Sequence, residues 1–333
     1  MPDAVKRPRS FLLAAALVAL ALAAASVAPG CGLAKRIGVG FVYDRAALPE
    51  ANVRRGLAYV EGSADPKHRL NLFLPLADSV RGGPWPTVVF VHGGNWDSGD
   101  RDFTFGGADL YNNVGRFFAA RGIGAAVVSY RLLPTVRWEQ QIEDVARAVA
   151  WAHRNVGAYG GDPRALFVMG HSAGGQLVAR VALDPAPLRR QGLSTDVLCG
   201  AMPVSGAGYD LTDVESYRIA ENFDFYASRF GTPETPLTEL PPAETFAWQA
   251  AASPTTFVRR DAPPFLLLYA GGDYPALRRQ AHLLDDALRA AGARSRIVVV
   301  PGQSHTRIVP TLSRDDRTAG PALLAFVREQ ACG

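Results

Sequence analysis

The sequence is poor in cysteine, with three among 333 residues, and neither its cysteines nor its six histidines have the spacing of metal ligands. We therefore expect no metal centre and no cofactor. No segment gathers lysine and arginine between aromatic residues, which argues against a nucleic-acid partner despite a net charge of +4. The glycine-rich stretches fit neither a dinucleotide-binding nor a phosphate-binding loop.

The chain has only one long apolar run, and this run is short for a membrane-spanning helix. It covers residues 11–27 after a basic start, whereas a spanning helix needs about 20 apolar residues. The layout is typical of a bacterial secretory signal, which we place at residues 1–30. Two forms of processing stay open: cleavage after Ser26-Val27-Ala28, or lipoprotein processing that makes Cys31 the lipidated first residue and attaches the protein to a membrane. An uncleaved anchor is the alternative to both. We therefore predict that the protein is exported, as a periplasmic, outer-membrane or cell-surface lipoprotein or as a secreted protein.

Two cysteines follow residue 31. An oxidising compartment would allow Cys199 and Cys332 to form a disulfide bond. Cys199 lies in the apolar run Val197-Leu198-Cys199, and the spacing of the two cysteines does not test the pairing. We predict a buried free thiol at Cys199.

Strand-like and helix-like segments alternate along the chain from about residue 56. Strands are expected at 56–61, 69–74, 87–91, 123–130, 165–169, 197–204, 265–270 and 297–300, and helices at 138–155, from about 173, at 281–291 and at 321–330. This alternation predicts an α/β domain at 56–333, with a mostly parallel central sheet covered by helices on both faces, after a tether and lead-in at 31–55. The pattern weakens at 206–261, which we interpret as a cap or lid over the carboxyl edge of the sheet, or else as an irregular surface loop.

The sequence around Ser172 carries the functional prediction. A short apolar run ends at Gly170, Ser172 follows two residues later, and Gly174 stands two residues further on. A strand that turns sharply into a helix would hold the serine hydroxyl at the apex, with room for the two backbones to approach. The Gly-x-Ser-x-Gly pattern predicts a nucleophilic serine, with the N–H of Ala173 pointing to a developing oxyanion.

A serine nucleophile needs a base and a group that orients the base. Of the six histidines, His305 alone lies in a loop just after a late strand, from which it would reach back over the sheet edge to Ser172. Asp273 directly follows a buried strand, and a carboxylate at the carboxyl end of a strand faces the same crevice. We predict that Asp273 orients His305, with Asp210 and Asp261 as weaker candidates.

Acyl transfer places negative charge on a carbonyl oxygen, and each preorganised N–H donor is worth roughly 3–4 kcal/mol. The run Gly93-Gly94-Asn95 directly follows a buried strand and is predicted to supply such donors beside Ala173. Trp96 is predicted to line the acyl or alcohol pocket, or else to be a core residue under the loop. His171, inside the turn, is a second candidate for a substrate contact.

From about residue 55 onward, these motifs give the chain a resemblance to the α/β-hydrolase superfamily. The run from His92 to Trp96, the turn at Ser172, Asp273 and His305 look like the esterase/lipase group related to hormone-sensitive lipase. The tryptophan at position 96 makes this motif resemble that of the branch that contains carbohydrate acetyl and feruloyl esterases, kynurenine formamidases and prenylcysteine methylesterases. Relatives of hormone-sensitive lipase usually have glycine or alanine where this chain has Asn95, which favours the tryptophan branch.

The resemblance implies an α/β-hydrolase fold and a cofactor-free serine hydrolase. Ser172 would be acylated, His305 would act as base and then as acid, and Asp273 would fix His305. The implied substrate is a small-molecule ester with a short acyl group. Arylformamidase-like amide hydrolysis and lipase activity are alternatives, and export disfavours the formamidase. A non-catalytic binding protein on a hydrolase fold is a further alternative.

Overall fold

The structure is a computed structural model that describes residues 45–80, 82–105, 108–243, 245–314 and 318–330. The predicted signal peptide with Cys31, and Cys332 at the other end of the chain, lie outside these residues. Within the described ranges, no helix is both long and apolar enough to cross a membrane.

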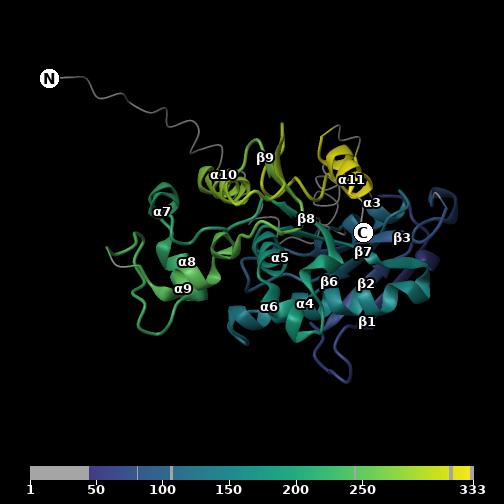
Figure 1. Cartoon of the computed structure of the whole chain (residues 1–333), viewed down its shortest axis with the longest axis horizontal. Helices are drawn as coiled ribbons and strands as arrows, with labels where there is room; N and C mark the ends of the chain where they lie inside the picture. The colour runs from purple at the N-terminus through teal and green to yellow at the C-terminus, as the bar shows by residue number, and fades with distance from the viewer. Residues whose placement is uncertain (1–44, 81, 106–107, 244, 315–317, 331–333) are drawn as a thin grey trace, which may run out of the picture.

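An eight-stranded sheet in the order β1-β2-β6-β3-β7-β8-β9-β10 forms the centre of the molecule (Figure 1). Its strands are β1 (Val53–Ala58), β2 (Arg69–Phe73), β3 (Trp85–Val91), β6 (Gly124–Val128), β7 (Gly161–His171), β8 (Leu198–Val204), β9 (Phe265–Ala270) and β10 (Ser295–Val300). β2 is antiparallel to β1 and to β6. Every pair from β6 to β10 is parallel, which confirms the predicted mostly parallel sheet.

Helices cover both faces of the sheet, and three others, α7 to α9, gather at one end of it. The helices are α3 (Asn112–Ala119), α4 (Trp138–Asn155), α5 (Ala173–Leu183), α6 (Pro185–Arg190), α7 (Val214–Ala220), α8 (Phe223–Phe230), α9 (Ala247–Ala252), α10 (Pro275–Ala290) and α11 (Ala319–Glu329). In β3, Val89 and Val91 belong to the core shared with α4, α5 and α10. Val88 and Phe90 belong to the opposite core, shared with α3 and α11. Because successive strand side chains point to opposite faces, a single buried strand contributes to both cores.

Some predicted bounds agree with the structure and others differ. The helix at 138–155 and the strand at 265–270 have the predicted ends. Helix α10 begins at Pro275, six residues before the prediction, because proline fits the first turn, where no intrahelical N–H bond is needed. Helix α3 was not predicted, although its eight residues are all buried.

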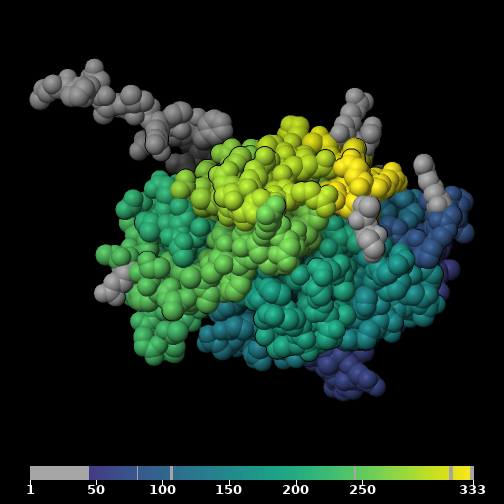
Figure 2. Space-filling view, viewed as in Figure 1, coloured from purple at the N-terminus to yellow at the C-terminus, as the bar shows by residue number. Residues whose placement is uncertain are grey.

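The segment 206–261 contains α7, α8 and α9, which gather at the left-hand end of the molecule in Figure 1. In the space-filling view of Figure 2, the same segment forms the green mass at that end. Its core is aromatic: the Tyr217 ring makes edge contacts with Phe223 and Tyr226. We call this segment the cap.

The prediction of a free thiol at Cys199 is wrong. Cys199 lies on β8 and is buried, as expected from its apolar run, but it is disulfide-bonded. Its partner lies outside the described residues. Apolar neighbours in the sequence indicate burial of a cysteine, whereas pairing depends on a distance in space that spacing along the chain does not give.

Candidate functional site

Ser172 occupies a sharp turn between β7 and α5. Its backbone angles, φ of 53° and ψ of −120°, are unusual for a residue other than glycine, and such a conformation costs of the order of 1–3 kcal/mol. The glycines on either side are required by space. A Cβ on Gly170 would lie 2.1 Å from the carbonyl oxygen of Gly174, and one on Gly174 would lie 2.3 Å from that of Val91. The turn therefore depends on the small residues noted in the sequence.

Two loops bring His305 and Asp273 to Ser172. The Nε2 of His305 lies 3.0 Å from the Ser172 hydroxyl oxygen, and its Nδ1 lies 3.0 Å from Oδ1 of Asp273. Asp273 follows β9, and His305 follows β10, the neighbouring strand. With Nδ1–H donating to Asp273, Nε2 is free to accept the proton of the serine hydroxyl. We call these three residues the Ser172 cluster.

The carboxylate of Asp273 is suited to stay ionised. Burial raises its pKa, but the hydrogen bond to His305 and the nearby Ser205 hydroxyl outweigh that effect and hold the pKa below its ordinary value. The backbone N–H of Tyr274 also donates to Oδ1, over 2.9 Å. An ionised carboxylate at this position can stabilise a positive charge that forms on His305.

The weaker candidates for the acid lie in other environments. Oδ1 of Asp210 accepts bonds from the N–H and the hydroxyl of Thr212 within its own turn. Asp261 is exposed and pairs with Arg259. Neither aspartate is hydrogen-bonded to His305, so the geometry favours Asp273.

The loop after β3 lies beside the serine turn, and both carry backbone N–H groups that could donate hydrogen bonds to a ligand. Among the described residues, no hydrogen bond occupies the backbone N–H groups of Gly94, Asn95 and Ala173. Gly94 has a φ of 120°, and a Cβ there would lie 2.2 Å from the carbonyl oxygen of Ser98. Asn95 and Trp96 also have positive φ, 53° and 64°. The three N–H groups are of the kind that can bind an oxyanion.

Gly93 differs from the other predicted donors. Burial raises the pKa of Tyr111 to about 12, and a hydrogen bond between the backbone of Gly93 and the Tyr111 hydroxyl partly offsets this rise. A Cβ on Gly93 would lie 3.0 Å from the carbonyl oxygen of His171 and 3.1 Å from Cβ of Ser172. Gly93 therefore contributes space, which lets the loop approach the serine turn.

A cavity of about 350 Å³ opens onto Ser172 and His305. Its other lining residues come from the loop after β3, from the cap and from the start of α10: Asn95, Trp96, Ala207, Ile219, Ala220, Asn222, Phe225, Tyr226, Tyr274, Pro275, Ala276 and Leu277. Trp96 is only 1% exposed, and its Nε1–H donates to Oε1 of Gln176 over 3.2 Å. Trp96 is therefore a core residue that also forms part of the cavity wall, and its contact with an acyl or alcohol group stays a prediction.

His171 is not among the residues that line this cavity. Its Nε2–H donates to the backbone carbonyl of His305 over 2.9 Å. Burial, and next the nearby charge of His305, lower the pKa of His171 to about 3, so its ring is neutral near pH 7. The structure thus gives His171 a different place from the predicted substrate contact: it holds the backbone of the His305 loop.

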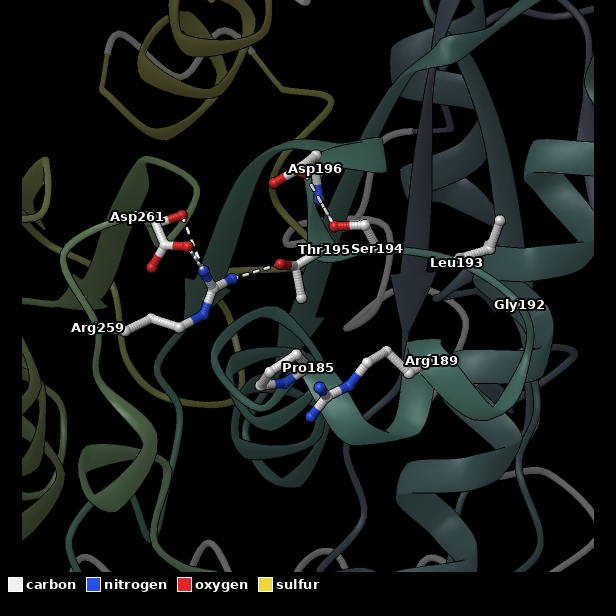
Figure 3. A pocket seen from close by; sticks show the side chains of 9 residues that line it. All are labelled: Pro185, Arg189, Gly192, Leu193, Ser194, Thr195, Asp196, Arg259 and Asp261. Carbon is white, nitrogen blue, oxygen red and sulfur yellow. Dashed lines mark hydrogen bonds and ion pairs between the residues drawn. The ribbon is translucent and has the colours of Figure 1, made fainter.

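A second cavity, of about 490 Å³, lies away from the Ser172 cluster near α6 (Figure 3). The Arg259 side chain in its wall is hydrogen-bonded to Thr195 and Asp261, so its charge is already compensated. In the part of the chain that the structure describes, no group of three or more His, Cys, Asp or Glu side chains is arranged to hold a metal ion.

Sequence reasoning missed the cap residues at the site. Asn222, Phe225 and Tyr226 line the cavity, and Arg229 contacts the loop after β3. The aromatic residues of this segment indicated a cap, but nothing in the sequence showed which of them would face Ser172. The one available signal is their helical spacing at i, i+3, i+4 and i+7.

Comparisons with known proteins identify the family of this chain. The BD-FAE family model matches residues 70–288, more than half of the chain. The isoprenylcysteine alpha-carbonyl methylesterase ICME of Arabidopsis thaliana is 28% identical over 264 residues, which are 76% of this chain and 56% of the relative. Esterase LipC of Mycobacterium tuberculosis is 34% identical over 227 residues, 67% of this chain and 53% of the relative. The chain thus spans a little over half the length of these curated relatives.

Solved structures show the same fold. Esterase B from Lactobacillus Rhamnosis has a TM-score of 0.68 at 22% identity, with 92% of this chain and 93% of that chain covered. The esterase from Pyrobaculum calidifontis has a TM-score of 0.65 at 23% identity, with 90% and 92% covered. These findings confirm the predicted resemblance to the esterase/lipase group: the chain has the α/β-hydrolase fold and belongs to the BD-FAE family.

Proposed function

We propose that this protein is a carboxylesterase-type serine hydrolase that forms an acyl-enzyme at Ser172. The hydrogen-bond chain from Ser172 through His305 to Asp273 carries the proposal. The unoccupied N–H groups beside it and the cavity above it support the same chemistry. The names of ICME and LipC, both esterases, agree with it.

In the acylation step, Oγ of Ser172 attacks the ester carbonyl carbon while its proton passes to Nε2 of His305. The carbonyl oxygen becomes an oxyanion that accepts hydrogen bonds from Gly94, Asn95 and Ala173. The bond from carbon to the leaving oxygen then breaks, and His305 gives its proton to the departing alcohol. Asp273 stabilises the imidazolium between these two transfers.

Deacylation repeats the sequence with water. His305 takes a proton from a water molecule, whose oxygen attacks the acyl-enzyme carbonyl and forms a second oxyanion in the same place. The bond to Oγ of Ser172 breaks, Oγ recovers the proton from His305, and the carboxylic acid leaves. No cofactor enters either step.

The cavity favours small, uncharged esters with short acyl groups. Its volume of about 350 Å³ lies near the lower end of small-molecule pockets, about 300–1,000 Å³. Its lining is apolar and aromatic apart from Asn95, Asn222 and the reacting side chains, and none of the described lining residues is a lysine, arginine, aspartate or glutamate. A charged substrate would therefore lose hydration without gaining an ion pair.

Hydrolysis of p-nitrophenyl esters from acetate to long-chain acyl groups tests the proposal, with Ser172→Ala measured beside the wild type. We expect activity that peaks at short chains and is lost in the variant. A peak at long chains would identify a lipase instead. Hydrolysis of formanilides without hydrolysis of esters would identify an amidase, and inactivity of the folded protein on both would favour a binding protein.

We also propose that the protein is exported and that Cys31 is lipidated. The proposal rests on the pattern of residues 1–31, and the disulfide at Cys199 is consistent with an oxidising compartment. Incorporation of labelled fatty acid in a bacterial host, with Cys31→Ser as the control, tests it. Label in the wild type alone is the expected result, and a soluble, unlabelled, cleaved product would leave export standing without lipidation.

A further inference from the structure

The cap touches the loop after β3 through one arginine. The Nε–H of Arg229, on α8, donates to the backbone carbonyl of Asn95 over 2.9 Å. Its Nη2 lies 2.6 Å from Oδ2 of Asp97, two residues further along the same loop. One guanidinium therefore holds a main-chain and a side-chain oxygen of the loop that carries the unoccupied donors.

The arginine is itself fixed by its own helix. Its Nη1–H groups donate to the carbonyl of Phe225 and to the Ser228 hydroxyl, each over 3.1 Å. The guanidinium carbon lies 3.8 Å from the centre of the Phe225 ring, and the side chain is 18% exposed. A planar group with all three nitrogens engaged has little freedom to move, which a lysine ammonium at the same place would retain.

The loop needs such support because two consecutive non-glycine residues, Asn95 and Trp96, have positive φ. The carbonyl of Trp96 accepts a hydrogen bond from Nε2 of Gln141 over 2.7 Å. Arg229 supplies the corresponding bond to the carbonyl of Asn95. The two bonds hold the peptide groups that follow Asn95 and Trp96, and thereby the chain on the carboxyl side of the unoccupied Asn95 N–H.

We propose that Arg229 is a positioning residue for the oxyanion donors, so that the cap takes part in catalysis as well as roofing the cavity. The inference rests on the proposed function of Ser172. Asp97 compensates the arginine charge nearby, so the effect is one of geometry. A donor that drifts from its place weakens binding of the transition state more than binding of the substrate, because the charge on the oxygen develops only as the serine attacks.

The test compares Arg229→Met and Arg229→Lys with the control Arg218→Met. Arg218 is an exposed arginine on α7, in the same cap, and its one ion pair among the described residues is a 3.8 Å contact with Glu215. For each protein we would measure kcat and KM on p-nitrophenyl acetate, the second-order rate of labelling by a fluorophosphonate, and Tm. The labelling rate depends on the same donors and needs no knowledge of the natural substrate.

Removal of one whole oxyanion donor costs about 100- to 1,000-fold in kcat, and misplacement of one donor should cost less. We expect Arg229→Met to lower kcat and the labelling rate by about 10- to 100-fold, with KM changed by less than about twofold. Arg229→Lys should recover part of the loss, and Arg218→Met should match the wild type.

Three results would overturn the inference: kcat and labelling unchanged in Arg229→Met, a rise in KM alone, or losses that track Tm equally in both methionine variants. Failure of the proposed function would be seen differently, as a wild-type protein that neither hydrolyses the ester nor reacts with the fluorophosphonate. In that case the inference falls with it.

Discussion

Among the described residues, two series of hydrogen bonds join a serine, a histidine and an aspartate, and they differ in whether a cavity and unoccupied N–H donors lie beside the serine. In the Ser172 cluster, serine, histidine and aspartate are joined by two contacts of 3.0 Å. In the second series of hydrogen bonds, the hydroxyl of Ser63 lies 2.7 Å from Nδ1 of His68, and Nε2 of His68 lies 3.1 Å from Oδ1 of Asp144. We call these last three residues the Ser63 cluster. The residue types and the order of contacts are the same.

The first difference is whether nearby cations already compensate the charge of the aspartate. Asp144 is completely buried and receives two hydrogen bonds of 2.8 Å from the Arg131 guanidinium and a contact of 3.1 Å from Arg147. Its negative charge is already compensated by two cations. Asp273 has no arginine or lysine partner among the described residues. Its charge is available to a developing imidazolium.

The second difference is the setting of the serine. Ser63 lies in the turn between β1 and β2, where its hydroxyl also accepts a hydrogen bond from the N–H of Asp65 over 3.2 Å. Ser63 lines neither of the two cavities described above. Ser172 has a strained φ, faces a cavity and stands beside unoccupied N–H groups. The series of hydrogen bonds alone therefore does not define a site; the strained turn, the donors and the space for substrate do.

Removal of each serine hydroxyl gives the largest expected contrast. Ser172→Ala should lower kcat by about a million-fold, as expected when a nucleophile is lost. Ser63→Ala should leave kcat and KM within about twofold of the wild type, a change of under about 1 kcal/mol, because its hydroxyl meets no substrate. Initial rates on p-nitrophenyl acetate, with circular dichroism to show that each variant is folded, make the measurement. Comparable losses in the two variants would remove the distinction.

Replacement of each aspartate should act on different quantities. Asp273→Asn should lower kcat by about 10,000-fold, because an amide would favour the wrong tautomer of His305 and would not stabilise its cation. Asp144→Asn should leave kcat nearly unchanged at a temperature where the protein is folded. Rates on the same ester, measured at matched folded fraction, decide the matter. If Asp273→Asn kept most of its activity, Asp210 would become the next candidate for the acid.

The free energy of unfolding of alanine variants at the same two positions should show the reverse order. Asp144→Ala leaves Arg131, Arg147 and His68 without their shared carboxylate, and breaking a buried ion pair in this way costs about 3–5 kcal/mol. Asp273→Ala removes an acceptor from His305 and from the N–H of Tyr274 but leaves no arginine unpaired, so it should cost less, about 1–3 kcal/mol. Urea unfolding at pH 7 measures both free energies. A larger loss in Asp273→Ala would contradict the assignment of a structural role to the Ser63 cluster.

The sequence predicts the Ser172 cluster well because the constraints there are local. Gly170 and Gly174 are required by contacts of 2.1 and 2.3 Å that any Cβ would make, so the motif itself carries the turn. Asp273 and His305 follow from strand ends, because parallel strands bring their carboxyl ends to one edge. Most strand positions follow from the apolar runs, whereas the order of the strands in the sheet does not.

Other features depend on contacts between distant segments, which a single sequence does not reveal. His68 meets Asp144 across 76 positions, and Arg229 meets Asn95 across 134. The disulfide at Cys199 is a contact of this kind. His171 shows a further limit: its place in the motif was plain, but the direction of its side chain, toward the carbonyl of His305, was not.

The smallest expected effect concerns pH and the neutral histidine beside the Ser172 cluster. The pKa of His171 is lowered to about 3 in the folded protein, whereas an unfolded histidine has a pKa near 6.5. Between these values the unfolded chain binds the extra proton, so the stability present above about pH 6.5 is lost as the pH falls. From pH 6 to pH 5 this group should cost about 1 kcal/mol. His171→Gln, whose amide can still donate to His305, should lose that much less stability than the wild type over the same interval. Urea unfolding at the two pH values measures the difference, and equal slopes would mean that His171 becomes protonated in the folded state at an ordinary pH, so that its ring would no longer be a neutral support for the His305 loop.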